Sequence, residues 1–391
     1  TNEWMMISTV NPGPRYDAGA LYKDLTDSKI GTMLDAQWFT QRLSNVLFTM
    51  FEKMGILCGI GLLVIIVPFL LDIRLIALAL APIAFGLVSA FATLRLLHHP
   101  LDIPGLLLIV VVFGMGIDYP IYFIGSHQRY FDETEPEMAR IRTTVFMNAG
   151  STIIGLAMLS LAGHALLRSA GLSMVLGLFY ALVGTVALLP PILRKIYPAS
   201  LPITTSPLVP STAGSREHRR LVLSAYKYME TYVRMFARFK MRLDPMFPKL
   251  AEFVAPEGKI LDIGCGYGVP AAWIVAFYPR INITGIEPDS VRARVARRVI
   301  GPRGKVIQGK APDLPKLQET YDTALLIDFI HYLDDEDLFK TLRTVHGLLK
   351  PGGSIVLRVT IPSSKALPWE RWLELLRSKF TGVKNHFRPG H

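Results

Sequence analysis

The segment LDIGCGYG, residues 261–268, decides the fold of the second half of the chain. Its apolar start predicts a buried strand, and the glycines that follow predict a sharp turn into a helix. Working outward, the same half alternates short apolar strands with helices. The predicted strands are KILDIG, NITGIEP, KVIQG, YDTALLI and GSIVLRV, and the predicted helices lie near 270–277, 289–299, 334–349 and 368–378. Such alternation is typical of a doubly wound α/β domain with a parallel sheet, which binds ligands at the carboxyl ends of its strands.

The glycine loop and a later acidic residue form one pattern. Gly264, Gly266 and Gly268 allow a close backbone approach to a ligand, and Glu287 ends the second predicted strand. An acid about 20 residues beyond such a loop is placed to accept hydrogen bonds from ribose hydroxyls. A dinucleotide-binding dehydrogenase shows a similar loop and acid, so these features alone leave two enzyme classes open.

The first half of the chain has a different character. Apolar runs long enough to cross a bilayer predict five transmembrane helices, at about 54–71, 75–97, 105–125, 144–164 and 170–190. The Lys and Arg residues lie in the first and third loops and after the last span, so these segments are predicted to be cytoplasmic. Residues 1–53 are then the end of an extracytoplasmic domain with a lead-in helix, and the chain beyond 195 is cytoplasmic. Because the chain begins at Thr1, we expect it to be a fragment of a longer protein.

An ionisable residue interrupts the third predicted span. The stretch GMGIDYP, residues 114–120, places Asp118 and Tyr119 near its middle. A charge at membrane depth is costly and usually faces a partner or a water-filled path, which favours a proton relay. The alternative is that the carboxylate is satisfied by a polar neighbour on the next span, such as Asn148, Ser151 or Thr152.

Composition limits the remaining classes. The chain of 391 residues is 51% hydrophobic and has a formal charge of +11. No zinc-finger spacing or RNA-binding aromatic strand accompanies this charge, so we expect no nucleic acid and assign the basic residues to a cytoplasmic membrane face. Only two cysteines occur, Cys58 and Cys265, which predicts no disulfide framework and no metal site.

The junction between the halves is rich in Pro, Ser and Thr, and residues 196–218 are predicted to be a linker. Residues 219–243 are basic and carry apolar side chains at near-helical spacing, namely Leu221, Ala225, Tyr228, Tyr232, Met235, Phe236 and Phe239. One interpretation is an amphipathic helix that docks on anionic headgroups of membrane lipids. The other is that this helix covers the soluble domain, with its charged face in water.

The first half resembles the carboxyl-terminal half of resistance-nodulation-division exporters, in the branch named for the large mycobacterial membrane proteins. The resemblance rests on the helix count, on GMGIDYP, and on LLRSAGLSMVLGLFYALVGTVALLPPIL in the last span. It implies that Asp118 and Tyr119 belong to a proton path, that a lipid-like molecule is moved, and that a second, amino-terminal exporter half is a partner.

The second half is similar to class I S-adenosylmethionine-dependent methyltransferases over roughly 245–391. LDIGCGYG, GIEPD, YDTALLIDFIHYL and LLKPGGSIVLRV together carry the resemblance. It implies that Asp262, Gly264 and Gly266 surround the methionine part of the cofactor and that Glu287 binds the ribose. Gly268 is also expected to bind the cofactor, and Asp328 is expected to frame the pocket. Relatives often place an acid after the third strand to bind adenine, but here Lys310 stands there. Either backbone groups near Ala311 read the base, or the affinity for the cofactor is poor. His331 is a candidate general base, and the alternative is that it is structural or only lines the pocket.

Together the two halves predict a membrane exporter followed, over 219–391, by a Rossmann-like methyltransferase domain. The predicted protein exports a lipid-like or aryl-acyl product across the inner membrane and methylates that product or a precursor in the cytoplasm. Two alternatives remain: an exporter whose added domain only senses the cofactor or is degenerate, and an enzyme whose spans are only an anchor.

Overall fold

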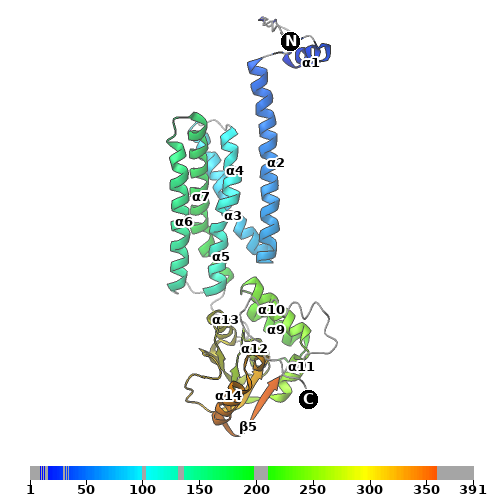
Figure 1. The fold of residues 1–391 in the computed structure, drawn as a ribbon, viewed down its shortest axis with the longest axis vertical. Coiled ribbons are helices and arrows are strands. Elements are labelled where there is room, and N and C mark those ends of the chain that lie inside the picture. The colour runs from blue at the N-terminus through cyan, green and yellow to red at the C-terminus, as the bar shows by residue number, and fades with distance from the viewer. Residues whose placement is uncertain are drawn as a thin grey trace. The chain divides into compact units, whose positions relative to one another are not determined.

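The computed structural model describes residues 9, 11, 13, 16–29, 31, 33, 35–98, 103–130, 136–197 and 210–358 (Figure 1). The chain divides into two compact units. The first comprises Thr1–Ile124 with Ala139–Ile192, and the second comprises Gly125–Met138 with Leu193–His391. Most of the predicted linker, and the helix predicted near 368–378, lie outside the described residues.

The first unit is helical. Its helices, some of which run on into the second unit, are α1 (Ala18–Ser28), α2 (Ala36–Leu70), α3 (Ile73–Leu96), α4 (Ile103–Gly116), α5 (Asp118–Tyr130), α6 (Pro136–Ser160) and α7 (Ala165–Ile196). Within the described residues, α2, α3, α6 and α7 are long and apolar enough to cross a membrane. Large apolar side chains lie exposed along these helices, as a lipid environment requires.

The expectation of five membrane-spanning helices is not confirmed. The third predicted span, 105–125, is divided into α4 and α5, because the helix stops at Gly116 and a new one starts at Asp118. Glycine is a weak helix former, and Asp is favoured in the first turn of a helix, where its charge interacts well with free backbone N–H groups. Asp118 therefore lies at a helix start and not in the middle of a continuous helix.

The second unit contains the predicted α/β domain. Its elements are α9 (Arg216–Tyr226), α10 (Thr231–Leu243), α11 (Met246–Leu250), η1 (Ala251–Phe253), β1 (Glu257–Ile263), α12 (Val269–Phe277), β2 (Arg280–Glu287), α13 (Ser290–Ile300), η2 (Gly301–Arg303), β3 (Gly304–Gln308), β4 (Tyr321–Ile327), η3 (Ile330–Tyr332), α14 (Asp335–Leu348) and β5 (Leu349–Arg358). The strands pair in parallel in the order β3-β2-β1-β4-β5. This confirms the predicted doubly wound parallel sheet.

Alternating side chains of the strands build two cores. Ile260 and Ile283 belong to a cluster with α9 to α13, whereas Leu261 and Ile286 belong to a cluster on the other face with Val345 of α14. The sheet is thus covered by helices on both faces, which is why its central strands carry apolar side chains toward both faces. The strand order reverses between β1 and β4, and ligands of such folds bind beside that point.

The basic stretch 219–243 folds differently from the prediction. It forms two helices, α9 and α10, and their buried residues include Val222, Ala225, Tyr226, Val233, Ala237 and Met241. These side chains join the core, so the helices cover the domain as the second interpretation expected. The apolar face was assigned wrongly, however, because Tyr232 and Phe239 are exposed. The break at residues 227–230 shifts the helical phase, which a single continuous period cannot anticipate.

Candidate functional site

The loop after β1 is fixed to the end of β2 by backbone hydrogen bonds. The N–H groups of Gly264 and Cys265 donate to the Ile286 carbonyl at 2.8 and 3.2 Å. Gly268 has φ of +73°, and a Cβ there would meet the Cα of Ala296 at 3.0 Å. Glycine at this position therefore lets the start of α12 approach α13 closely.

Gly266 is the glycine that faces open space. Its φ is +57°, and a Cβ on it would meet no atom within 4 Å. A protein backbone that turns here without a side chain leaves room for a ligand to lie against the loop.

Glu287 holds this loop in place with its buried carboxylate. The Gly266 N–H donates to its Oε2 at 2.9 Å, and the Asp289 N–H donates to its Oε1 at 3.2 Å. Each oxygen of a carboxylate can accept more than one hydrogen bond. Glu287 can therefore position the loop and still accept hydrogen bonds from the hydroxyls of a ligand.

Asp262 lies buried at the carboxyl end of β1, only 2% exposed. Burial, and to a lesser extent the charge of Glu287, raises the pKa of Asp262 to about 7. Its Oδ2 is buried and has no hydrogen-bond partner within the described residues. A buried acceptor without a donor is costly, so this oxygen is suited to a donor that a ligand brings.

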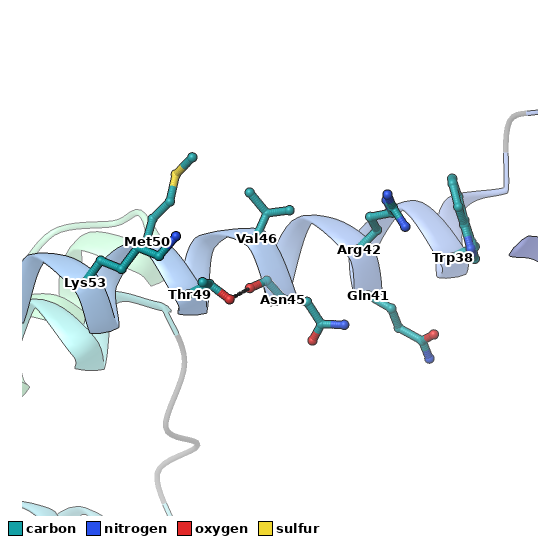
Figure 2. A pocket seen from close by; sticks show the side chains of 8 residues that line it. All are labelled: Trp38, Gln41, Arg42, Asn45, Val46, Thr49, Met50 and Lys53. Carbon is teal, nitrogen blue, oxygen red and sulfur yellow. Dashed lines mark hydrogen bonds between the residues drawn. The ribbon is translucent and has the colours of Figure 1, made fainter.

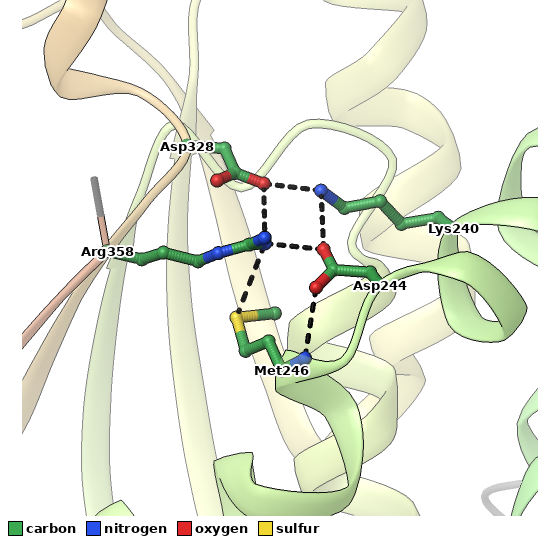
Figure 3. A network of polar contacts seen from close by, with 5 residues as sticks. All are labelled: Lys240, Asp244, Met246, Asp328 and Arg358. Atoms are coloured by element: carbon green, nitrogen blue, oxygen red, sulfur yellow. Dashed lines mark hydrogen bonds and ion pairs between the residues drawn. The ribbon is translucent and has the colours of Figure 1, made fainter. Parts of the chain in front are cut away.

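Asp328 directly follows β4 and belongs to a network of four charged side chains (Figure 3). Its Oδ2 accepts hydrogen bonds from Lys240 of α10 and from Arg358 at the end of β5, the latter at 3.0 Å. The same two cations contact Asp244, which follows α10. Burial acts to raise the pKa of Asp244, but the Met246 N–H and the two cations outweigh it and lower that pKa.

The other oxygen of Asp328, Oδ1, is buried and has no partner among the described residues. Asp328 also adopts a left-handed backbone conformation with φ of +52°, which Asp tolerates better than most residues. The structure therefore brings Asp262 and Asp328 to the ends of neighbouring strands, each with one buried oxygen that has no donor.

The remaining predicted residues of this domain lie around the same edge. His331 is half-buried on η3, and its ring lies 4.0 Å from that of Tyr332. Ala311 is buried in the core cluster that contains Ile286, whereas Lys310 is exposed.

Three residues of this edge were not predicted from the sequence, namely Lys240, Arg358 and Tyr267. Tyr267 lies in the glycine loop, where its ring contacts Phe236 at 5.1 Å and Tyr232 at 6.2 Å, both from α10. One signal was available, since Arg358 is a charge placed at the carboxyl end of an apolar strand. Lys240 and Asp328 form an ion pair, but they lie 88 residues apart in the chain, so no local sequence pattern predicts this contact.

In the first unit, Tyr119 is buried at the start of α5, and Asp118 is exposed on the surface of the unit. The hydroxyls of Ser151 and Thr152 donate to the Asn148 carbonyl of their own helix at 3.1 and 3.0 Å. The role of Asp118 and Tyr119 in a proton path stays a prediction.

A shallow pocket lies along α2 and is lined by one helix alone (Figure 2). Its residues are Trp38, Gln41, Arg42, Asn45, Val46, Thr49, Met50 and Lys53. These side chains project to different sides of the helix and enclose nothing, so the pocket carries no chemistry.

Both cysteines are free, and Cys265 is buried. Among the described residues, no group of three or more His, Cys, Asp or Glu side chains is arranged to hold a metal ion.

The residues at the carboxyl edge fit S-adenosylmethionine. This cofactor carries an ammonium group, ribose hydroxyls and a positively charged sulfur. The orphaned Oδ2 of Asp262 suits a cationic donor, the carboxylate of Glu287 suits hydroxyls, and the open space at Gly266 leaves room beside the loop.

Comparison with known proteins agrees with this fit. Residues 260–353 match the family described as "Methyltransferase domain". Over 119 residues the chain is 31% identical to a fatty-acid O-methyltransferase of Mycolicibacterium smegmatis, covering 30% of this chain and 43% of that protein. It is 30% identical to the ubiquinone/menaquinone biosynthesis C-methyltransferase of Syntrophotalea carbinolica, covering 29% of this chain and 49% of that protein.

The chain thus spans less than half the length of these two curated relatives. A solved structure of an S-adenosylmethionine-dependent methyltransferase from Mesorhizobium loti is 23% identical, with 37% of this chain and 74% of that chain covered at a TM-score of 0.30. The carboxyl-terminal part of this chain is an S-adenosylmethionine-dependent methyltransferase domain.

Proposed function

We propose that the second unit transfers a methyl group from S-adenosylmethionine to a lipid-like or aryl-acyl small molecule. The observation that carries this proposal is the pair of acids at the ends of β1 and β2, Asp262 and Glu287, beside the open space at Gly266. The cofactor supplies a methyl group that its sulfonium already activates, so the enzyme contributes chiefly position and electrostatics.

The chain's own residues have distinct roles in this proposal. Glu287 keeps the glycine loop in its bound shape and accepts hydrogen bonds from the ribose. Asp262 accepts a hydrogen bond from a cationic donor of the cofactor. His331, just beyond β4, takes the proton when the acceptor is a hydroxyl.

The acceptor class is supported by the similarity to a fatty-acid O-methyltransferase. The other curated relative is named as a C-methyltransferase, so the methylated atom is not fixed by similarity. An acyl or aryl-acyl acid is the acceptor that agrees best with the apolar first unit and with the basic character of the second.

The proposal for the whole chain is a protein of the inner membrane with several spans, which exports the product that its cytoplasmic domain methylates. Its support is four long apolar helices and an exposed carboxylate, Asp118, at a helix break among them. In the full-length protein, Asp118→Asn is expected to stop export of the product, whereas the exposed Glu52→Gln on α2 leaves export unchanged. Unchanged export in Asp118→Asn would support the alternative that the helices serve only as a membrane anchor.

Calorimetric titration of S-adenosylmethionine into the purified full chain tests the enzyme. We expect micromolar binding, and in Glu287→Gln a loss of about 100-fold, because one acceptor oxygen of a buried charge is replaced by a donor. Glu252→Gln, at an exposed acid, is the matched control. Equal affinity in both variants would show that the site lies elsewhere, and absence of binding to the folded chain would favour a degenerate domain.

A further inference from the structure

Helix α10 crosses the carboxyl edge of three strands. Near its start, Tyr232 and Phe236 contact Tyr267 in the loop after β1. In its last turn Lys240 contacts Asp328 after β4, and Asp244, directly beyond the helix, contacts Arg358 at the end of β5. Since β1, β4 and β5 are neighbours in that order, α10 runs from the glycine loop after β1 past the ends of β4 and β5.

One flank of α10 faces this edge and is both apolar and exposed. Tyr232, Phe236, Phe239 and Leu243 recur at helical spacing on the flank that also carries Lys240. We call these four side chains the α10 stripe. Tyr232 is 68% exposed, Phe239 48% and Leu243 73%, whereas Phe236 is half-buried and packs against the core, so most of the stripe is open to a ligand. Exposed apolar stripes of this kind usually mark a binding surface.

The charge of α10 narrows the class of molecule that fits. The helix sequence TYVRMFARFKMRL contains four basic residues and no acidic one. Arg238 and Arg242 are exposed, while Lys240 is half-buried in the Asp328 network. An apolar stripe bordered by cations is complementary to an amphipathic anion.

From this geometry we propose that the α10 stripe binds the apolar chain of the methyl acceptor, a long-chain carboxylic acid. The chain lies along Phe239 and Leu243, and its reactive end points toward Tyr267 and the glycine loop. Tyr232, Phe236, Phe239 and Leu243 are then specificity-determining residues that select acceptors by chain length. This inference rests on the proposed methyl transfer and adds to it the acceptor class and its place of binding.

Photoaffinity labelling of the full chain in lipid nanodiscs tests the proposal. The probe is palmitic acid with a diazirine on its chain, added with S-adenosylhomocysteine, and labelled peptides are located by mass spectrometry. We expect saturable labelling of 231–243 that unlabelled palmitic acid displaces. In the double variant Phe239→Ser, Leu243→Ser, the half-saturating concentration should rise about tenfold, because two apolar contacts are lost.

The matched control is Phe339→Ser on α14. Phe339 is 73% exposed, and α14 packs on the opposite face of the sheet, so this variant should label like the parent. Because Phe239, Leu243 and Phe339 are all exposed, both variants should have the melting temperature of the parent, which a thermal unfolding curve measures.

Several outcomes would overturn the inference. These are equal labelling of α10 and α14, labelling that the double variant does not change, and cross-links that join α10 of two chains. Equally strong labelling of α10 by a diazirine-bearing phospholipid would show that the stripe docks on a membrane surface.

The same sample separates this inference from the proposed function. If S-adenosylmethionine binds in calorimetry but α10 is not labelled, only the proposed acceptor site on the α10 stripe is contradicted. Specific labelling of α10 without any cofactor binding defeats the methyltransferase function and leaves an apolar ligand site.

Discussion

Asp262 and Asp328 are the same residue type at the ends of neighbouring parallel strands, yet their surroundings differ. Asp262 is buried beside a second acid, and its pKa is raised to about 7. Asp328 faces two cations, Lys240 and Arg358, which come from α10 and β5. The comparison teaches that position at the carboxyl edge does not decide the surroundings of an acid. Burial dominates at Asp262, whereas two cations from α10 and β5 pair with Asp328.

The largest expected effect is a gain of stability in Asp262→Asn. A carboxyl group whose folded pKa is raised binds its proton more tightly in the folded state than in the unfolded state. Its stabilising contribution is complete below about pH 4 and is lost as the pH rises toward 7. At pH 8 the variant should therefore be more stable than the parent by at most about 4 kcal/mol, and at pH 4 the two should be nearly equal.

Urea unfolding of the full chain at both pH values, without cofactor, measures this difference. The control is Asp313→Asn, because Asp313 forms only an exposed ion pair with Lys340. Equal destabilisation of Asp262→Asn at pH 4 and pH 8 would mean that burial does not disfavour the ionised form of Asp262.

For Asp328→Asn we expect the opposite effect, a loss of stability. Asp328→Asn removes the negative charge between Lys240 and Arg358, and we expect a loss of about 2 kcal/mol, because these partners are only partly buried. Asn tolerates the left-handed backbone as well as Asp does, so the change isolates the charge. Urea unfolding at low and at 1 M salt measures the loss, which salt should reduce. No loss at low salt would contradict the role of this network.

The smallest expected effect is a pH dependence of the affinity for S-adenosylmethionine. If a cationic group of S-adenosylmethionine requires ionised Asp262, binding must release the proton that this carboxyl holds below about pH 7. Affinity should then be about tenfold weaker at pH 6 than at pH 8, which corresponds to about 1.4 kcal/mol. Calorimetry over this range measures the slope, and Asp262→Asn should abolish it. An unchanged slope in that variant would assign the proton to another group.

The local patterns of the second half were sufficient to predict its architecture. The apolar strands, the glycine loop and Glu287 lie close together in sequence or at a spacing fixed by one strand-helix-strand unit. Their geometry follows from backbone preferences and from alternation of strands and helices, which need no distant partner.

The first half shows where periodicity fails. The run 105–125 is apolar except at Asp118, and its high mean hydropathy does not reveal that one helix ends at Gly116 and another begins at Asp118. Likewise, the composition of α10 indicated an amphipathic helix, but the break before Thr231 decided which of its side chains face the core.

The parallel sheet, the glycine loop and Glu287 after the second strand can be predicted from local sequence patterns, because each lies within one strand-helix-strand unit or repeats it. Which acids pair with cations and which apolar side chains stay exposed depends on the packing of the folded domain. Lys240 and Asp328 are 88 residues apart in the chain, and Tyr232 meets Tyr267 only because α10 packs across the edge of the sheet. Charge pairing and burial depend on distance in space, and the folding of the whole domain sets that distance.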